Sequence, residues 1–548
     1  MCGIVGYAGN IETACGKPLE VCLQGLERLE YRGYDSAGVA LTAPGMDKVV
    51  VRKKAGRLKN LVEDIERKPM PLATVGIGHT RWATNGEPSD VNAHPHTSMD
   101  GKVAIIHNGI IENASQLRLD LQAEGYRFAS ATDTEVAAKL LGKIVDKIIA
   151  DEGKPDLFKA VRRMARMLEG AFTILATDCR QPDIVVGARH DSPLVVGLGE
   201  GENFLGSDVA AFVAYTKRAM EVDQDQAVCV SADKVIVTDF DGNVVENPKT
   251  YTVDWDASAA EKGGWDSFMD KEIHEDPAAV QRTLLGRFDA NGGITLDEVR
   301  IDEHDFKAID KIIVVACGTA SYAGQVAKYA IEHWVRIPVE IELAHEFRYR
   351  DPILTPRTLV VAISQSGETM DTLMALRHAR EQGSKVLAIC NTQGASIPRE
   401  SDAVLYTHAG PEVAVASTKA FVAQITAAYL LGLYLAQVKG AMFRDEIHQV
   451  LDSLKDMPRK IQWVLDTQPK TIQAAAERMV NANSFLFLGR HVGYPVALEG
   501  ALKLKEIAYT FTEGFAAGEL KHGPIALVDE GEPVVFIVPP QRGRNVLH

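Results

Sequence analysis

Cysteine is scarce in this 548-residue chain, and positive charge is in deficit. The 7 cysteines are odd in number and scattered, and none belongs to a C-x-x-C pair. This usage is typical of a reducing cytosol and argues against a disulfide framework or a zinc site. The formal net charge of −15 argues against nucleic acid or an anionic membrane as the main partner. We therefore expect a cytoplasmic protein without a metal or another cofactor.

Long hydrophobic runs are also rare. Residues 420–438 are long and apolar enough to resemble a membrane-spanning helix, but they include Gln424, Thr426 and Gln437. This stretch lies between segments with helix and strand patterns, so we predict a buried core helix and no membrane partner. The N-terminus has no basic segment followed by an apolar one, so we expect no export signal. With 46% hydrophobic residues, the chain can build large cores in roughly three to four domains.

The composition and the pattern of apolar residues change along the chain. Residues 1–240 mix short apolar runs with amphipathic segments, which predicts an α+β sandwich of sheets flanked by helices. Residues 241–290 are polar and predict a linker. The rest alternates strand, glycine-rich turn and helix, which predicts doubly wound parallel α/β sheets over 291–450 and 451–548. Expected strands of the first domain include 49–51, 104–107, 173–176, 185–187 and 235–238, and expected helices include 117–124 and 134–149.

The second half contains an internal repeat. Residues 311–318 are echoed by 484–490, and a long helix is expected after each. Residues 342–347 are echoed by 519–524, and another apolar strand follows each. The first copy continues to about residue 450, whereas the second ends one strand later, at 534–539. On this alignment we expect the second of the two domains to be incomplete.

Cys2 is the first candidate catalytic residue. Removal of Met1 would leave it with both a thiol and a free α-amino group. An α-amino group titrates at about pH 7.7 to 8.0, close to the ideal for a general base, so one residue could supply nucleophile and base. A cysteine after an arbitrary initiator methionine is more often a small buried thiol, so the assignment depends on other residues.

A thiol that attacks the side-chain amide of glutamine also needs an amino-acid clamp and an oxyanion hole. Arg81, beside Trp82, can bind a substrate carboxylate in bidentate fashion. Asp133 can accept the substrate ammonium. Asn108 and Gly109 can offer a side-chain amide and a backbone N–H to a developing oxyanion. Each fragment alone is more often a packing pair, a helix cap or a turn, but together they predict a glutaminase site.

With the motifs YRGYDSAG at 31–38 and HTRWATNGEP at 79–88, these residues resemble the N-terminal-nucleophile glutamine amidotransferases. Within that class they resemble the isomerising glutamine:fructose-6-phosphate aminotransferases, or glucosamine-6-phosphate synthases. The resemblance implies that glutamine is hydrolysed at Cys2 and that ammonia passes through an internal channel to fructose 6-phosphate, giving glucosamine 6-phosphate. It also implies tandem sugar isomerase domains and a homodimer formed through them.

The second half carries hydroxyl-rich turns. Residues 364–369, of sequence SQSGET, put hydroxyls and backbone N–H groups at a helix N-terminus, which favours a phosphate. An ordinary helix cap is the alternative. The turns at 317–319 and 417–419 add further hydroxyls, and the resemblance implies that these turns converge on the phosphosugar. The candidate sugar-binding residues are Cys317, Thr319, Ser364, Gln365, Ser366, Thr369, Val415, Ser417 and Glu499.

Lys503 and Glu506 are three residues apart and so share a helix face. By the resemblance, they lie on the isomerising helix. A carboxylate there could move a proton between C1 and C2 of an imine, and the lysine would tune its pKa. A surface ion pair is the commoner explanation for such spacing. His522 could open the sugar ring as an acid or base.

Two features depart from the family pattern. Ala320 stands where many relatives have a serine, and Ser321 is the candidate replacement. Relatives continue into a C-terminal tail whose lysine forms a Schiff base with the sugar, and no motif before His548 replaces that lysine. The alternatives are a glutaminase-only or sugar-phosphate-sensing chain, and an amidotransferase acting on another ketose phosphate. Glutamine-dependent phosphoribosyl transfer is disfavoured, because no acidic pyrophosphate-binding motif follows an apolar strand.

Overall fold

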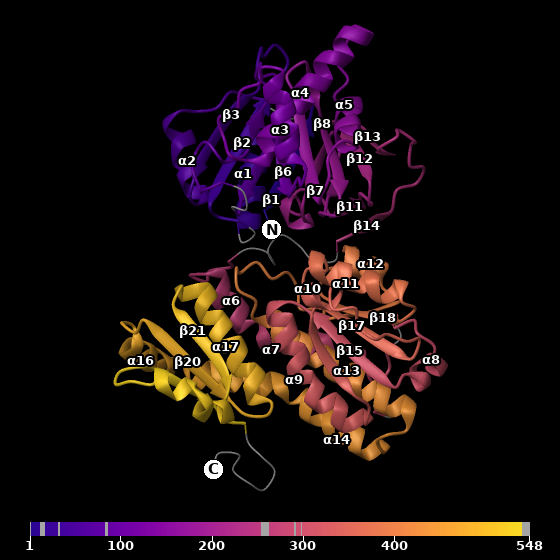
Figure 1. Ribbon diagram of the computed structural model, residues 1–548, viewed down its shortest axis with the longest axis vertical. Coiled ribbons are helices and arrows are strands. Elements are labelled where there is room, and N and C mark those ends of the chain that lie inside the picture. The colour runs from indigo at the N-terminus through magenta and orange to yellow at the C-terminus, as the bar shows by residue number, and fades with distance from the viewer. Residues whose placement is uncertain are drawn as a thin grey trace. The chain divides into compact units, whose positions relative to one another are not determined.

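The computed structural model describes residues 2–10, 17–30, 33–82, 86–253, 262–289, 292–296 and 299–539. The chain forms two compact units, Met1–Glu261 and Lys262–His548 (Figure 1). Five residues of the two N-terminal motifs lie outside the described residues: Tyr31, Arg32, Ala83, Thr84 and Asn85. Residues from 540 onward also lie outside them.

The first unit is built on two antiparallel sheets. Among the described residues, one sheet has the strand order β14-β11-β9-β10-β1-β4-β2-β3, and the other has the order β13-β12-β8-β7-β6-β5. The strands of the first sheet are β1 Gly3–Gly9, β2 Ser36–Thr42, β3 Val50–Ala55, β4 Val75–Arg81, β9 Val195–Leu198, β10 Glu202–Gly206, β11 Arg218–Glu221 and β14 Thr250–Thr252. Those of the second are β5 His96–Thr97, β6 Val103–Gly109, β7 Phe172–Asp178, β8 Gln181–His190, β12 Gln226–Val230 and β13 Val235–Asp239.

Helices cover the outer faces of both sheets. Buried side chains such as Ile4, Ile106 and Val228 fill the space between the sheets. Leu26 and Leu61 belong to the cluster outside the first sheet, and Leu141 belongs to the cluster outside the second. The helices are α1 Lys17–Leu29, α2 Leu58–Arg67, α3 Ala114–Ala123, α4 Asp133–Glu152 and α5 Leu157–Ala165, with a short 3-10 turn at Val209–Ala211. The predicted α+β sandwich is confirmed, and the predicted strands and helices overlap β3, β6, β7, β8, β13, α3 and α4.

The second unit contains a parallel sheet with helices on both faces. Its described strand order is β16-β15-β17-β18-β19. The strands are β15 Lys311–Ala316, β16 Val339–Leu343, β17 Thr358–Ser364, β18 Lys385–Cys390 and β19 Ala403–Tyr406. The helices before and around this sheet are α6 Phe268–His274, α7 Asp276–Leu284, α8 Glu303–Ala308, α9 Gly318–Val335, α10 Ala344–Phe347, α11 Met370–Glu381, α12 Ser396–Glu400, α13 Lys419–Lys439 and α14 Arg444–Lys455. This is the predicted doubly wound α/β architecture.

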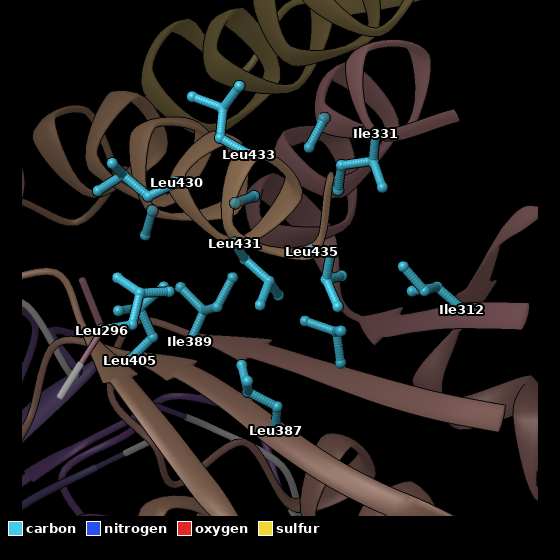
Figure 2. Packing of buried hydrophobic residues seen from close by; sticks show 14 of the residues in the cluster. Leu296, Ile312, Ile331, Leu387, Ile389, Leu405, Leu430, Leu431, Leu433 and Leu435 are labelled. Carbon is cyan, nitrogen blue, oxygen red and sulfur yellow. The ribbon is translucent and has the colours of Figure 1, made fainter. Parts of the chain in front are cut away.

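Helix α13 contains the apolar stretch that resembles a membrane span. By length and composition, it is the one helix among the described residues that could cross a membrane. Its leucines are buried in the core of the unit, with Leu430 and Leu433 fully buried and Leu431 1% exposed. Figure 2 shows Leu431 and Leu435 on the side of α13 that faces Leu387 and Ile389 of the sheet. The prediction of a buried core helix is confirmed.

The internal repeat predicted from the sequence is also present in the order and pairing of the strands. After α15 Met457–Thr467 and α16 Pro469–Met479 come β20 Ser484–Gly489, α17 Gly493–Ala508, β21 Phe511–Ala516, two 3-10 segments at Ala517–His522 and Pro524–Leu527, and β22 Val534–Ile537. β20 pairs in parallel with β21 and β22, just as β15 pairs with β16 and β17. As described, the sheet formed by β20, β21 and β22 has three strands, whereas the sheet that contains β15 has five.

One detail of the predicted repeat alignment differs. Strand β15 ends at Ala316, opposite Leu343, and β20 ends at Gly489, opposite Ala516. Leu343 therefore corresponds to Ala516 and not to Leu520, because the register of the strands, and not the similar letters, fixes the equivalence.

The predicted linker, residues 241–290, is divided between the two units. Strand β14 pairs with β11 and extends the first sheet. Helices α6 and α7 belong to the second unit. In α7, Ala279, Val280 and Leu284 are buried, which explains why a segment with a polar composition packs as a helix.

Candidate active site

Cys2 lies immediately before β1, a strand in the interior of the first sheet. The start of the strand is held by two hydroxyls: Thr80 Oγ1 accepts from the Gly3 N–H at 3.2 Å, and Ser207 Oγ accepts from the Ile4 N–H at 3.1 Å. A Cβ on Gly3 would lie 2.6 Å from Thr80 Oγ1 and 2.8 Å from the Leu29 Cβ. Glycine at position 3 is therefore required for the close packing that fixes Cys2.

Two predicted residues contact Cys2 directly. The Trp82 backbone N–H donates to Cys2 Sγ at 3.2 Å. The Asn108 side-chain amide donates through Nδ2 to the Cys2 carbonyl oxygen at 2.6 Å. Asn108 is followed by Gly109 at a φ of +115°, where an added Cβ would lie 2.0 Å from the Ala171 carbonyl oxygen. The structure thus brings one donor from β6 and one from the residue that follows β4 to the thiol-bearing residue.

Arg81 and Asp133 supply opposite charges close to this centre. Arg81 is 3% exposed at the end of β4, and Nη2 donates to the Gly86 carbonyl oxygen at 3.1 Å. Asp133 begins α4, where its Oδ2 accepts from the Ile111 N–H at 3.0 Å. The guanidinium interacts electrostatically with both Cys2 and Asp133. Trp82 is 44% exposed and packs edge-on against Tyr34, with ring centroids 5.5 Å apart.

The environment of the Cys2 thiol favours the protonated form. Burial raises the pKa of Cys2, while the hydrogen bond from the Trp82 backbone and the charge of Arg81 lower it. The thiol therefore needs a base at neutral pH. The α-amino group that removal of Met1 would free on Cys2 is the base that the sequence predicts.

Four buried histidines, which the sequence did not single out, lie in this unit: His79, His94, His96 and His107, all at most 5% exposed. The ring centroids of His79 and His94 are 4.2 Å apart, and those of His94 and His96 are 5.2 Å apart. Burial lowers the pKa of His79 to about 3 and also lowers that of each of the other three. The cluster is therefore neutral at physiological pH. In the sequence, only His79 and His107 stand beside short apolar runs, whereas His94 and His96 flank Pro95 in a segment without one, so nothing local indicated their burial.

We expect the first unit to lose stability on acidification below pH 6.5. The unfolded chain takes up protons at histidine below about pH 6.5, and the folded chain does not, so stability is complete above that pH and falls as the pH drops. Between pH 7 and 5 His79 alone should lower the free energy of unfolding by about 2 kcal/mol.

Hydrogen exchange followed by mass spectrometry on the full chain would measure this loss, with rates corrected for intrinsic pH dependence. Peptides of β4 and β6 should lose protection at pH 5, while β15 and β17, whose strands contain no histidine, serve as the internal control. Equal protection of β4 and β6 at both pH values would contradict the expectation.

In the second unit, the predicted turns at 317–319 and 364–369 lie at one edge of the parallel sheet. Cys317 follows β15, Ser364 ends β17, and Cys390 ends β18, and these strands are parallel neighbours. The strand order reverses between β15 and β17, and open α/β sheets bind ligands at such a switch point. Within the described residues, the Cys317 thiol accepts from Thr372 Oγ1 at 3.9 Å.

The turn at 364–369 is internally braced. Ser364 Oγ lies 3.0 Å from Thr369 Oγ1 and accepts from the Gly367 N–H at 3.1 Å. Ser366 Oγ accepts from the Glu368 N–H at 3.2 Å. Gly367 has a φ of +67°, and a Cβ there would lie 2.6 Å from the Ala395 Cβ. The backbone oxygen of Gln365 accepts from the Asn391 N–H at 3.2 Å. The turn leads directly into the N-terminus of α11.

A buried carboxylate holds the second hydroxyl turn. Glu412 accepts from Ser417 Oγ at 2.9 Å, from the Thr418 N–H at 2.8 Å and from the Ala420 N–H at 3.0 Å, and so caps α13. Val415, in the same turn, is 52% exposed. Glu412 was not predictable from the sequence, because its partners are defined only once the turn has folded.

Lys503 forms a network and not a surface ion pair. Its Nζ lies 2.6 Å from Glu506 Oε2 and 3.4 Å from Glu499 Oε1, and it donates to Thr319 Oγ1 at 2.9 Å. Thr319 Oγ1 in turn donates to Glu499 Oε1 at 3.1 Å. The Lys503 and Glu499 side chains are 18% and 8% exposed. Burial raises the pKa of Glu499, and Lys503 opposes that effect.

Three candidate residues make no interaction with this network within the described part of the chain. His522 is exposed in the 3-10 segment after β21, and no interaction recorded among the described residues joins it to Lys503. Ala320 and Ser321 are both buried in the first turns of α9, at 9% and 1% exposed. Neither provides an exposed hydroxyl at this edge of the sheet.

Comparison with known proteins places these features in a family. A glutamine amidotransferase domain model matches residues 79–214, and a SIS domain model matches residues 306–434 and 478–547. The chain is therefore an amidotransferase joined to SIS domains.

Relatives that match the full length of the chain show which family of amidotransferases it belongs to. The chain is 62% identical over 550 residues to the glutamine–fructose-6-phosphate aminotransferase (isomerizing) of Corynebacterium diphtheriae, covering 100% of this chain and 87% of that protein. The enzyme of the same name from Streptomyces coelicolor is 59% identical with the same coverage. The solved C-terminal domain of glucosamine-fructose-6-phosphate aminotransferase from Francisella tularensis is 41% identical, with a TM-score of 0.50 over 52% of this chain and 78% of that one. The chain belongs to the glutamine–fructose-6-phosphate aminotransferase (isomerizing) family.

Proposed function

We propose that the chain transfers the amide nitrogen of glutamine to fructose 6-phosphate and isomerises the product to glucosamine 6-phosphate. The full-length identity to enzymes named for this reaction carries the proposal. The two clusters described above supply the chemistry. That identity disfavours a sugar-phosphate sensor and a phosphoribosyl transferase.

In the first unit, Arg81 and Asp133 bind the α-carboxylate and α-ammonium of glutamine, and Trp82 flanks them. The Cys2 thiol attacks the side-chain amide, and its α-amino group, free once Met1 is removed, takes the thiol proton and passes it to the leaving ammonia. Asn108 and the backbone N–H of Gly109 stabilise the oxyanion of the tetrahedral intermediate. Water then cleaves the thioester and releases glutamate.

In the second unit, the turn at 364–369 and the start of α11 bind the phosphate of fructose 6-phosphate through hydroxyls and backbone N–H groups. Ser417, Val415, Thr319 and the Cys317 turn complete the sugar pocket. The position of the Cys317 turn and of residues 364–369 at the switch point of the parallel sheet supports this assignment.

The Lys503 network performs the isomerisation. Ammonia, passed internally from the first unit, condenses with C2 of the open-chain sugar and expels water. Glu506 then removes the C1 proton and returns it to C2, while Lys503 and Glu499 set its charge environment. His522 opens the sugar ring as acid or base. We further propose that the chain is cytoplasmic and forms a homodimer. The homodimer is supported by large apolar side chains exposed from α15 to β22, including Trp463, Ile472, Phe511 and Phe536.

A paired assay on the purified chain tests the proposal. Glutamate release and glucosamine 6-phosphate formation should appear together when glutamine and fructose 6-phosphate are both supplied. Unphosphorylated fructose, which lacks the group bound by residues 364–369, should give no amino sugar. Glutamate release without amino sugar would restrict the function to the first unit, and no glutamate release would refute it.

A further inference from the structure

His79 lies beside the proposed oxyanion hole but has no part in the chemistry above. It is fully buried on β4, two residues before Arg81, and therefore on the same face of the strand. Its Nε2 is 2.9 Å from the His107 carbonyl oxygen and 3.1 Å from Asn108 Oδ1. These contacts join β4 of one sheet to β6 of the other.

The His107 carbonyl determines which ring nitrogen of His79 carries the proton. A backbone carbonyl oxygen can only accept a hydrogen bond, so Nε2 must be an N–H donor. An atom of Asn108 that faces the same N–H must also be an acceptor, so it is Oδ1 and not Nδ2.

The orientation of the Asn108 amide follows from this contact. The two ends of an asparagine amide have nearly the same shape, so packing alone does not distinguish them. With Oδ1 on His79, Nδ2 points at the Cys2 carbonyl oxygen 2.6 Å away, which is again an obligatory acceptor. If the amide turned over, two acceptors would face each other at Cys2, and the proposed oxyanion hole would lose its side-chain donor.

We infer that His79 is a positioning residue that orients the Asn108 amide toward Cys2. The inference rests on the proposed glutaminase function of the first unit. His79 contacts neither substrate nor thiol, and it acts only through Asn108. Because the oxyanion exists only during the reaction, loss of this orientation should reduce kcat for glutamine hydrolysis and leave KM for glutamine nearly unchanged.

The test compares three variants of the full chain. His79→Leu removes the donor and should lower kcat about 100-fold, the usual effect of losing one oxyanion donor. His79→Gln places an amide N–H near the position of Nε2 and should recover kcat to within about tenfold of the parent. His94→Leu is the matched control: it makes the same change in the neighbouring ring, 4.2 Å away, and should keep kcat within a few-fold.

A second readout separates orientation from damage to the nucleophile. Alkylation of Cys2 by iodoacetamide needs the thiol but no oxyanion hole, so its rate, followed on the N-terminal peptide, should be the same in parent and His79→Leu. Parental kcat in His79→Leu would overturn the inference while leaving the glutaminase proposal intact. Equal losses in His79→Leu and His94→Leu, or slowed alkylation, would also overturn it. A parent chain without glutaminase activity would overturn both proposals.

Discussion

Replacing Cys2 by alanine is expected to abolish glutamine hydrolysis, with a loss of at least about 10⁴-fold in kcat. Alanine retains the free α-amino group after removal of Met1 but provides no atom that can form a thioester. The Trp82 N–H and the Asn108 amide would still converge on residue 2, but without a covalent intermediate to stabilise. Water attacking glutamine directly would have only the binding energy of the site to assist it.

The measurement is glutamate release, coupled to glutamate dehydrogenase, with and without fructose 6-phosphate. Cys22→Ala is the matched control, because Cys22 is a fully buried thiol in α1 and packs against Gly76 and Gly78. It should lower thermal stability and keep hydrolysis. If the kcat of Cys2→Ala for glutamine hydrolysis were within tenfold of the parent value, the nucleophile would have to be another group. The proposed glutaminase site of the first unit would then be wrong.

The elements that the sequence predicted are those specified locally. The predicted strands of the first unit carry apolar runs, and every residue of β7 and every residue of β6 except Gly109 is buried, because one face meets the other sheet and the opposite face meets helices. Asn108 and Gly109 could be paired with Cys2 because their chemistry suits the same reaction. The buried helix α13 was predictable because polar residues interrupt its apolar stretch.

Features that depend on distant partners were not predictable in this way. Strand β14 has three residues and gains its place only by pairing with β11. Glu412 has no recognisable motif, although it caps α13 and holds Ser417. His79 and Asn108 are 29 residues apart on different sheets, so their contact appears only when the two sheets pack. In each case, the missing information was a tertiary contact and not a local preference.

Replacing Ser366 by glutamate should abolish binding of fructose 6-phosphate. Ser366 lies in the braced turn before α11, with its Oγ 3.2 Å from the Glu368 nitrogen. A carboxylate there would compete with the ligand phosphate for the same N–H groups and would repel it. Two unit charges about 4 Å apart at an effective dielectric of about 20 repel by about 4 kcal/mol, which corresponds to at least about 10³-fold in affinity.

Isothermal titration with fructose 6-phosphate would measure the loss, and glutaminase activity without the sugar should be retained. Gln382→Glu is the matched control, since it adds the same charge at the other end of α11. Near-parental affinity in Gln382→Glu with none in Ser366→Glu would locate the effect in the turn and not in the net charge. Undiminished binding of fructose 6-phosphate by Ser366→Glu would show that this turn does not bind the phosphate. The sugar would then have to be held by the Cys317 turn, whose one threonine hydroxyl is already engaged by Glu499 and Lys503, and by Ser417, whose hydroxyl is already engaged by Glu412.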